Sequence, residues 1–233
     1  MNCLQKFTVL LALLALINAK SDYRVTNVDK NLSRVTLTLT YTGTDQYYLK
    51  PTSPITRDLK FVFNVHAFYD FYIKITDLHN PRYEVPQNDP WPIDPLAQFT
   101  YPINLAGFTF EYTSYPFDFR IIRKINGATI FSTYEKTFIF SEHYMQIGTE
   151  VDTPYIYGLG ERFEAGFRKT EGKWTIFNRD RGQVIDRGQG KQTYGYYPVY
   201  FARERSQHFH FNYLRNSNAM DVIVSTANNK TYV

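Results

Sequence analysis

The sequence has 233 residues, of which 43% are hydrophobic and 21% are charged. This balance is too apolar for a disordered chain and not apolar enough for a bundle of membrane helices. The formal net charge is +4 and the basic residues are scattered, so the sequence lacks the cluster of basic residues that is typical of nucleic-acid binding. Aromatic residues make up 18% of the chain, a content that favours β-strands over helices.

Residues 1–19 have the pattern of a secretory signal peptide, with a positive charge at Lys6 and an apolar run over 7–19 that ends in a small residue. The run is shorter than the roughly 20 residues that a membrane-spanning helix needs, so we expect no membrane anchor. Cleavage would remove Cys3, the single cysteine, and leave a mature chain without disulfides. We predict delivery to the secretory pathway, extracellular or lysosomal.

Strand patterns recur along the rest of the chain, and no segment has the periodicity of a helix of three turns. The predicted strands are 35–41, 59–63, 71–75, 108–112 and 117–122. Short strands separated by turn residues are typical of a large antiparallel β-sandwich, so the predicted fold class is all-β. Because no shift in composition and no repeat divides the sequence, we expect residues 20–233 to form one domain.

Turn signals separate these strands. Asn126-Gly127 is expected to form a two-residue type I′ turn, which joins 117–125 and 128–134 in a hairpin. Proline and asparagine cluster at 79–81 and 86–92 and predict a loop. Two sequons predict N-glycosylation at Asn31 and Asn229.

The segment from Trp174 to Tyr200 contains the residue types that bind sugars. Residues 174–177 are predicted to form a strand, and residues 181–195 are expected to loop out. Sugars need apolar ring faces and groups that accept hydroxyl protons, and this segment has both. The alternative is a solvated hairpin loop whose tyrosines cap the core, and composition alone favours that alternative. The aromatic candidates are Tyr194, Tyr196 and Tyr197.

Two other patterns are weaker. His208 and His210 alternate with phenylalanines, so on a strand both histidines and Asn212 would face one side. Two imidazoles suit zinc or copper, but no third ligand is near in sequence, so we expect a hydrogen-bonded or solvated pair and no metal site. Residues 157–162, Tyr-Gly-Leu-Gly-Glu-Arg, lack the third glycine of a phosphate-binding loop and are expected to form a tight turn. The sequence does not place Glu161 and Glu164 at the separation that glycoside chemistry needs.

Several motifs, taken in order, resemble the N-terminal domain of family 31 glycoside hydrolases, the α-glucosidases. The most specific is Leu-Arg-Asn-Ser-Asn-Ala-Met-Asp-Val at 214–222, which differs from the family's motif at Arg215. The others are the segments 74–86, 116–127, 156–162 and 177–180. The resemblance covers roughly residues 22 to 224.

The resemblance implies a galactose mutarotase-like β-sandwich that packs on a catalytic (β/α)8 barrel. In the family the nucleophile and the acid are aspartates of the barrel, so we expect this chain to be non-catalytic and to need no cofactor. The aspartate of the family's Asn-Arg-Asp loop reaches the sugar, which implies that Asp180 binds substrate. The expected partners are an α-glucoside or maltose-type oligosaccharide and, where one is joined, the barrel.

Two departures and two alternatives accompany this prediction. Tyr197 stands where the family commonly has histidine. The sequence also stops at Val233, before the strands that finish the family's domain, and this departure predicts an unpaired sheet edge. One alternative is a stand-alone aldose 1-epimerase-like enzyme with His210 as acid and Asp180 or Glu161 as base. The other is a secreted carbohydrate-binding module without chemistry.

Overall fold

The computed structural model describes residues 21–44, 53–84, 100–164, 168–178, 180 and 189–233. The predicted signal peptide and the predicted loop at 86–92 lie outside these residues. The described residues are mainly antiparallel strands, with one short 3-10 turn at Ile103–Leu105. The all-β sandwich class predicted from the sequence is confirmed. In the described part of the chain, no helix is long and apolar enough to cross a membrane.

The chain divides into two compact units. The first unit contains residues 1–127 and 131–149, and the second contains residues 128–130 and 150–233. The single domain predicted for residues 20–233 stays a prediction.

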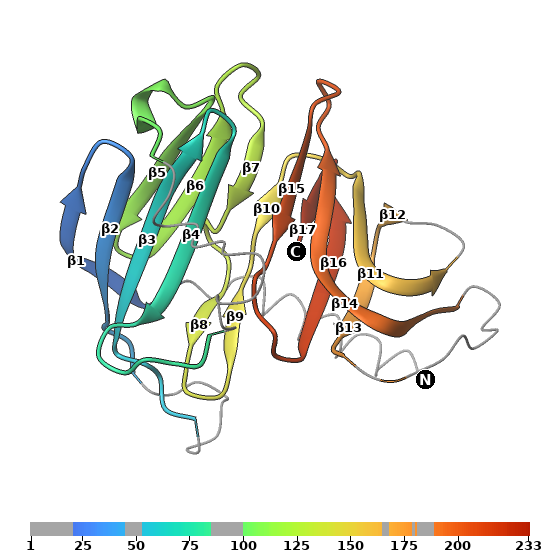
Figure 1. Ribbon diagram of the computed structural model, residues 1–233, viewed down its shortest axis with the longest axis horizontal. Helices are drawn as coiled ribbons and strands as arrows, with labels where there is room; N and C mark the ends of the chain where they lie inside the picture. The colour runs from blue at the N-terminus through green and yellow to red at the C-terminus, as the bar shows by residue number, and fades with distance from the viewer. Residues whose placement is uncertain (1–20, 45–52, 85–99, 165–167, 179, 181–188) are drawn as a thin grey trace. The chain divides into compact units, whose positions relative to one another are not determined.

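The first unit is built from antiparallel sheets that follow the chain order (Figure 1). The first sheet contains β1 (Tyr23–Lys30), β2 (Arg34–Tyr41), β3 (Asp58–Ala67) and β4 (Asp70–Asp77). The second contains β5 (Phe108–Ser114), β6 (Phe117–Arg123) and β7 (Thr129–Ser132), and a ribbon is formed by β8 (Phe138–Phe140) and β9 (Met145–Ile147). The first two residues of β7 are counted with the second unit. The five strands predicted in this part of the sequence are all present.

Aromatic rings form the core of the first unit. Phe63 of β3 stacks on Phe110 of β5 with ring centroids 4.2 Å apart and the planes 8° from parallel. The ring centroid of Phe61 in β3 lies 5.1 Å from that of Phe119 in β6. Strand β2 alternates buried apolar residues with half-exposed ones, as one face of a sheet on a core requires. The two sheets therefore pack face to face through these rings.

The hairpin between β6 and β7 is confirmed, but its predicted turn type is wrong. Residues 124–128 make the connection, and within it only Gly127 has a positive φ, of 70°. Its N–H donates to the Arg123 carbonyl at 2.9 Å, which closes a wider turn than type I′. A type I′ turn needs positive φ at two successive residues, and this condition is met instead by Asn228 and Asn229, at 52° and 59°, between β16 and β17.

The second unit is a sandwich of two four-stranded sheets (Figure 1). One sheet has the order β10 (Glu150–Val151), β17 (Lys230–Tyr232), β16 (Met220–Ala227) and β13 (Gly172–Ile176). The other has the order β12 (Arg168–Lys169), β11 (Ile156–Glu164), β14 (Gln189–Arg203) and β15 (Phe209–Tyr213). Both sheets contribute to a buried apolar cluster that includes Val151, Ile156, Leu159, Ile176, Tyr200, Ala202 and Val224.

Candidate functional site

In its described residues, the predicted sugar-binding segment is largely strand. The prediction of a strand before it is confirmed by β13, but the expected loop is wrong over 189–195, because these residues belong to β14. The reason is pairing with β11, in which Gln192 lies opposite Arg162. Gln192 is buried, and its side chain accepts from the Phe177 N–H at 3.1 Å and donates to the Gly195 carbonyl at 3.0 Å. Residues 181–188 lie outside the described residues.

The Tyr-Gly-Leu-Gly-Glu segment is a bulged part of strand β11, so the prediction of a tight turn is wrong. Its register against β14 shifts on both sides of Gly160. Gly158 has a φ of 115°, and a Cβ there would lie 2.6 Å from the carbonyl oxygen of Val199, so only glycine fits. The irregular backbone buries the Leu159 side chain in the core and leaves Glu161 exposed.

Glu161 is held as a carboxylate against the neighbouring strand. Its Oε2 atom accepts the Gly195 N–H at 2.9 Å, and this hydrogen bond lowers the pKa of the carboxyl group below its ordinary value. A Cβ at Gly195 would lie 2.3 Å from the ring of Tyr197 and 3.1 Å from the Cβ atom of Glu161. The absence of a side chain at Gly195 therefore lets the Tyr197 ring and the Glu161 side chain lie side by side.

The three predicted tyrosines have two different roles. Tyr194 and Tyr197 are 53% and 59% exposed, so each presents a ring to solvent. Tyr196 is half-buried, and its hydroxyl lies within hydrogen-bonding distance of the carbonyl oxygens of Asn216 and Asn218, 2.8 Å from the latter. Burial raises the pKa of Tyr196 to about 12. Tyr196 thus anchors the segment before β16 to strand β14.

Asp180 is exposed and follows the end of β13 at Ile176. Arg179 before it lies outside the described residues, as do residues 181–188. The role of Asp180 in substrate binding stays a prediction.

The histidines lie apart. His208 precedes β15, is exposed and has its Nδ1 atom 3.0 Å from the Ser206 hydroxyl. His210 is buried, and its Nδ1 atom lies 3.0 Å from Oε1 of Glu204, which is also buried. Within the described ranges, no group of three His, Cys, Asp or Glu residues is arranged to hold a metal ion. Because His210 faces inward onto Glu204, it is not presented to a substrate as the epimerase alternative requires.

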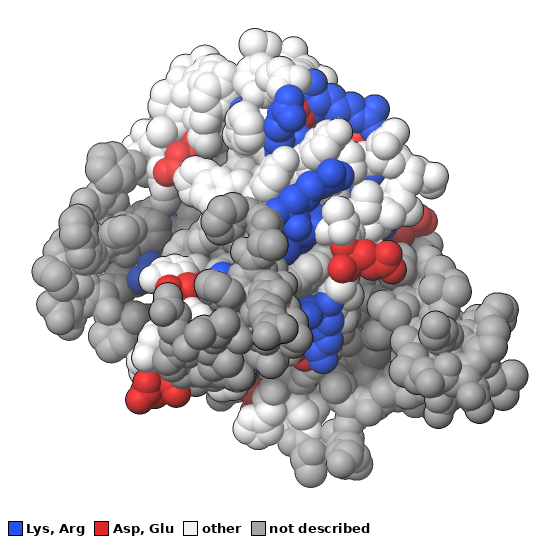
Figure 2. Space-filling model, turned by 90° about the vertical axis from the view of Figure 1, so that its right-hand side faces the viewer, with Lys and Arg blue, Asp and Glu red and all other residues white. Residues whose placement is uncertain are grey.

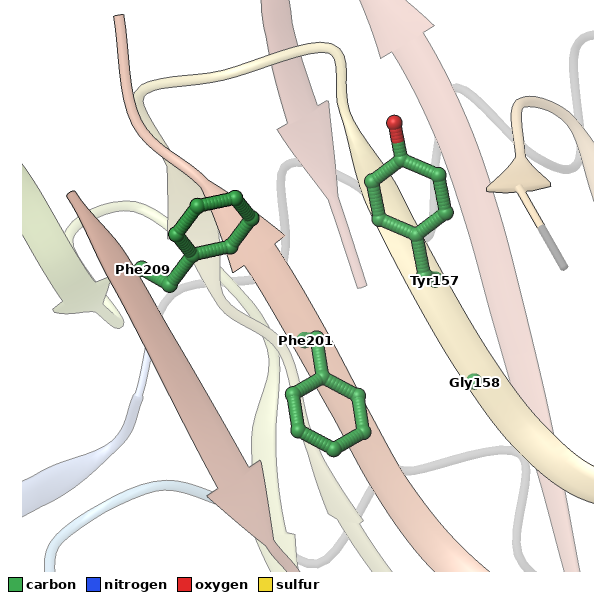
Figure 3. Close-up of a pocket in the computed structure, with 4 residues that line it drawn as sticks. All are labelled: Tyr157, Gly158, Phe201 and Phe209. Atoms are coloured by element: carbon green, nitrogen blue, oxygen red, sulfur yellow. The ribbon is translucent and has the colours of Figure 1, made fainter. Parts of the chain in front are cut away.

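The outer side of the β11–β14–β15 sheet carries an aromatic face that sequence reasoning missed. We define this aromatic face as Tyr157, Phe201, Phe209, Phe211 and Tyr213, the last four of which are 47–68% exposed. Three of its rings and Gly158 line an open hollow of about 450 Å³ (Figure 3). The alternation of aromatic and polar residues in 208–213 was the available signal, but alternation does not say which side of a strand faces the core.

Charged residues on the surface occur with both signs. Figure 2 shows Lys and Arg interspersed with Asp and Glu over the described part of one side of the molecule. In the second unit, Lys173 lies 2.8 Å from Asp221.

Comparison with known proteins identifies relatives over most of the chain. The lysosomal acid alpha-glucosidase of Tetrahymena pyriformis is 30% identical over 219 residues, which are 93% of this chain and 24% of that protein. Human intestinal sucrase-isomaltase is 33% identical over 169 residues, 70% of this chain and 9% of that protein. The chain is related to the family 31 glycoside hydrolases.

The resemblance predicted from the motifs is confirmed, and the chain corresponds to an N-terminal domain of that family. It spans about a quarter of the length of the Tetrahymena relative. The cycloalternan-forming enzyme of Listeria monocytogenes, solved in complex with a pentasaccharide substrate, is 14% identical, with a TM-score of 0.49 over 91% of this chain and 20% of that one. A scan of the chain against models of protein families found no match.

Proposed function

We propose that this family 31 domain is the non-catalytic, carbohydrate-recognising N-terminal domain of an α-glucosidase. It binds maltose-type α-glucosides at a sugar cluster, defined as Glu161, Asp180, Tyr194 and Tyr197. Tyr196 holds the strand that carries Tyr194 and Tyr197 through its hydrogen bonds to the carbonyl oxygens of Asn216 and Asn218. In a longer protein, a (β/α)8 barrel joined to the domain supplies the nucleophile and the acid.

The observation that carries this proposal is the pairing of an ionised carboxylate with exposed aromatic rings. Glu161 is exposed and charged above pH 4.5, the ordinary pKa of its carboxyl group, because the Gly195 N–H stabilises the ionised form. The Tyr197 ring packs beside it, and Tyr194 is exposed on the same strand. A sugar ring rests its apolar face on an aromatic ring while its hydroxyl groups donate to carboxylate oxygens.

The secretory destination belongs to the same proposal. Relatives named as lysosomal and intestinal enzymes support it. The predicted glycosylation sites Asn31 and Asn229 lie in exposed turns, between β1 and β2 and between β16 and β17, where a glycan has room.

Calorimetric titration with maltose and longer α-1,4-glucans tests the proposal. We expect saturable binding, and we expect Tyr197→Ala to weaken it about threefold to tenfold, because one stacked ring contributes about 0.5–1.5 kcal/mol. Asp180→Asn is expected to weaken binding while leaving the melting temperature unchanged, since Asp180 is exposed. Tyr83→Ala is the matched control, because Tyr83 is a 79% exposed tyrosine of the first unit.

Two results would contradict the proposal. One is the absence of binding to any α-glucan by a chain whose circular dichroism shows folded β-structure. The other is release of glucose from maltose above a blank, which would show that the chain itself carries both catalytic groups.

A further inference from the structure

The sequence contains one asparagine that is followed by glycine, Asn126-Gly127, in the connection between β6 and β7. An Asn-Gly pair between two strands commonly forms a type I′ turn, but this connection does not form one, because only Gly127 within it has a positive φ. The turn type therefore does not account for the pair. What the pair retains is the reactivity of an asparagine next to glycine, which involves only these two neighbouring residues.

Gly127 leaves room for the Asn126 side chain to approach the main-chain nitrogen that follows it. Both residues are exposed. A Cβ built on Gly127 would have no described atom within 4 Å, so no other described segment fills the space beside this residue. Glycine also has no side chain of its own to hinder the approach, and its backbone reaches conformations that other residues avoid. The side-chain carbonyl carbon of Asn126 and the Gly127 nitrogen can therefore close a five-membered ring.

The main-chain nitrogen of Gly127 is hydrogen-bonded in the folded connection. Its N–H donates to the Arg123 carbonyl oxygen at 2.9 Å. While this hydrogen bond is formed, the nitrogen keeps its proton and points toward Arg123. The residue after Arg123 is anchored as well, because the Lys124 N–H donates to the Gly107 carbonyl at 2.9 Å. A short exposed segment such as 125–127 opens at a low free-energy cost, without unfolding of the strands that it joins.

We propose that Asn126 is a site of spontaneous deamidation, and that the hydrogen bond from Gly127 to Arg123 limits its rate. When this bond opens, the Gly127 nitrogen loses its proton to water and attacks the Cγ atom of Asn126. A new N–Cγ bond forms, the Cγ–Nδ2 bond breaks, and ammonia leaves. Water then opens the resulting succinimide at either of its carbonyl groups, which gives aspartate or isoaspartate. The net reaction consumes one water molecule, releases one ammonia and leaves a carboxylate at residue 126.

The reaction changes the connection that closes the β6–β7 hairpin. In the succinimide the Gly127 nitrogen carries no hydrogen, so its bond to the Arg123 carbonyl is lost. In isoaspartate the main chain runs through the former side chain and is one carbon longer. The connection then no longer has the length at which the Gly127 N–H meets Arg123. We therefore expect the isoaspartate form of the chain to be less stable than the unmodified form.

Peptide mapping by mass spectrometry, after incubation of the purified chain at mildly alkaline pH, tests the proposal. Trypsin releases residues 125–136, in which Asn126 is the only amide side chain. It also releases residues 216–230, which contain four asparagines that are not followed by glycine and serve as the internal control. We expect residues 125–136 to reach the deamidated mass about tenfold faster or more. Asn126→Gln should abolish this change, because a glutamine would have to close a six-membered ring.

The same map recorded in urea tests the role of the hydrogen bond. The bond to Arg123 is absent from the unfolded chain, so we expect Asn126 to react severalfold faster there than in the folded chain. Ion exchange then separates the aged form from the unmodified one. Urea denaturation of the isoaspartate form should show lower stability than freshly purified Asn126→Asp, which carries the same charge on a main chain of ordinary length.

Three results would overturn parts of this proposal. Deamidation of residues 125–136 no faster than that of residues 216–230 would remove Asn126 as a special site. Equal rates in the folded and the unfolded chain would show that the bond from Gly127 to Arg123 does not limit the reaction. Equal stability of the isoaspartate form and Asn126→Asp would assign the effect to the added charge and not to the longer main chain.

Discussion

Phenylalanines at alternate positions of a strand are buried in the first unit and exposed in the second. In the first unit, Phe61 and Phe119 are 0% and 1% exposed, and their rings pack between two sheets. In the second unit, Phe209 and Phe211 are 60% and 68% exposed on the outer side of a sheet. The inner side of that sheet carries Ile156, Leu159 and Tyr200, which belong to the buried apolar cluster of the unit. These phenylalanines therefore belong to the core in the first unit and to the surface in the second.

The largest expected effect comes from removing a core ring of the first unit. Phe61→Ala should lower the free energy of unfolding by about 3–5 kcal/mol, because it leaves a cavity among Phe110, Phe117 and Phe119. Urea denaturation followed by circular dichroism measures this change. Phe61→Leu is the milder control, and a loss below about 1 kcal/mol for the alanine variant would contradict the role of Phe61 as a core residue.

Patterning within a strand was predictable from the sequence, whereas pairing between distant strands was not. The alternation in 35–41 predicted β2 because every second residue faces the core. The strand over 189–195 was missed because its partner β11 lies some thirty residues earlier, and no local signal reports such pairing. Similarly, Asn126-Gly127 has the composition of a type I′ turn, but that backbone is found at Asn228-Asn229, where the strands require it.

The candidate site shows the same division. Residue type alone identified three tyrosines as sugar-binding candidates. Sequence did not distinguish Tyr196, whose hydroxyl bonds to Asn216 and Asn218, from the exposed Tyr194 and Tyr197. That distinction depends on carbonyl groups about twenty residues further along the chain, which only the tertiary fold brings close.

Two carboxyl groups extend the comparison to pH dependence. In the first unit, burial raises the pKa of Asp118 from 3.8 to about 6. In the second, the Gly195 N–H lowers the pKa of the exposed Glu161. The stability that Asp118 contributes is present below pH 3.8 and is lost as the pH rises through about 6. Glu161 acts with the opposite sign, because its contribution is present above its ordinary pKa of 4.5 and is lost on acidification.

Unfolding of the chain at a series of pH values between 4 and 7 measures these contributions. We expect the first unit to lose on the order of 2 kcal/mol across this range through Asp118. Asp118→Asn should flatten that slope, since an amide does not titrate, while its oxygen can still accept the Thr133 hydroxyl, which donates to Oδ1 at 3.1 Å. An unchanged slope in this variant would assign the pH dependence to another group.

The smallest effect is expected on the aromatic face of the second unit. Phe211→Thr keeps a residue that favours strands, and the Phe211 side chain is already 68% exposed, so little apolar surface leaves the core. The free energy of unfolding should change by about 0.5 kcal/mol or less. The fluorescence of Trp174, which packs against the core of this unit, follows the unfolding. A change as large as that of Phe61→Ala would mean that Phe211 is buried in solution, and the contrast between the two units would then fail.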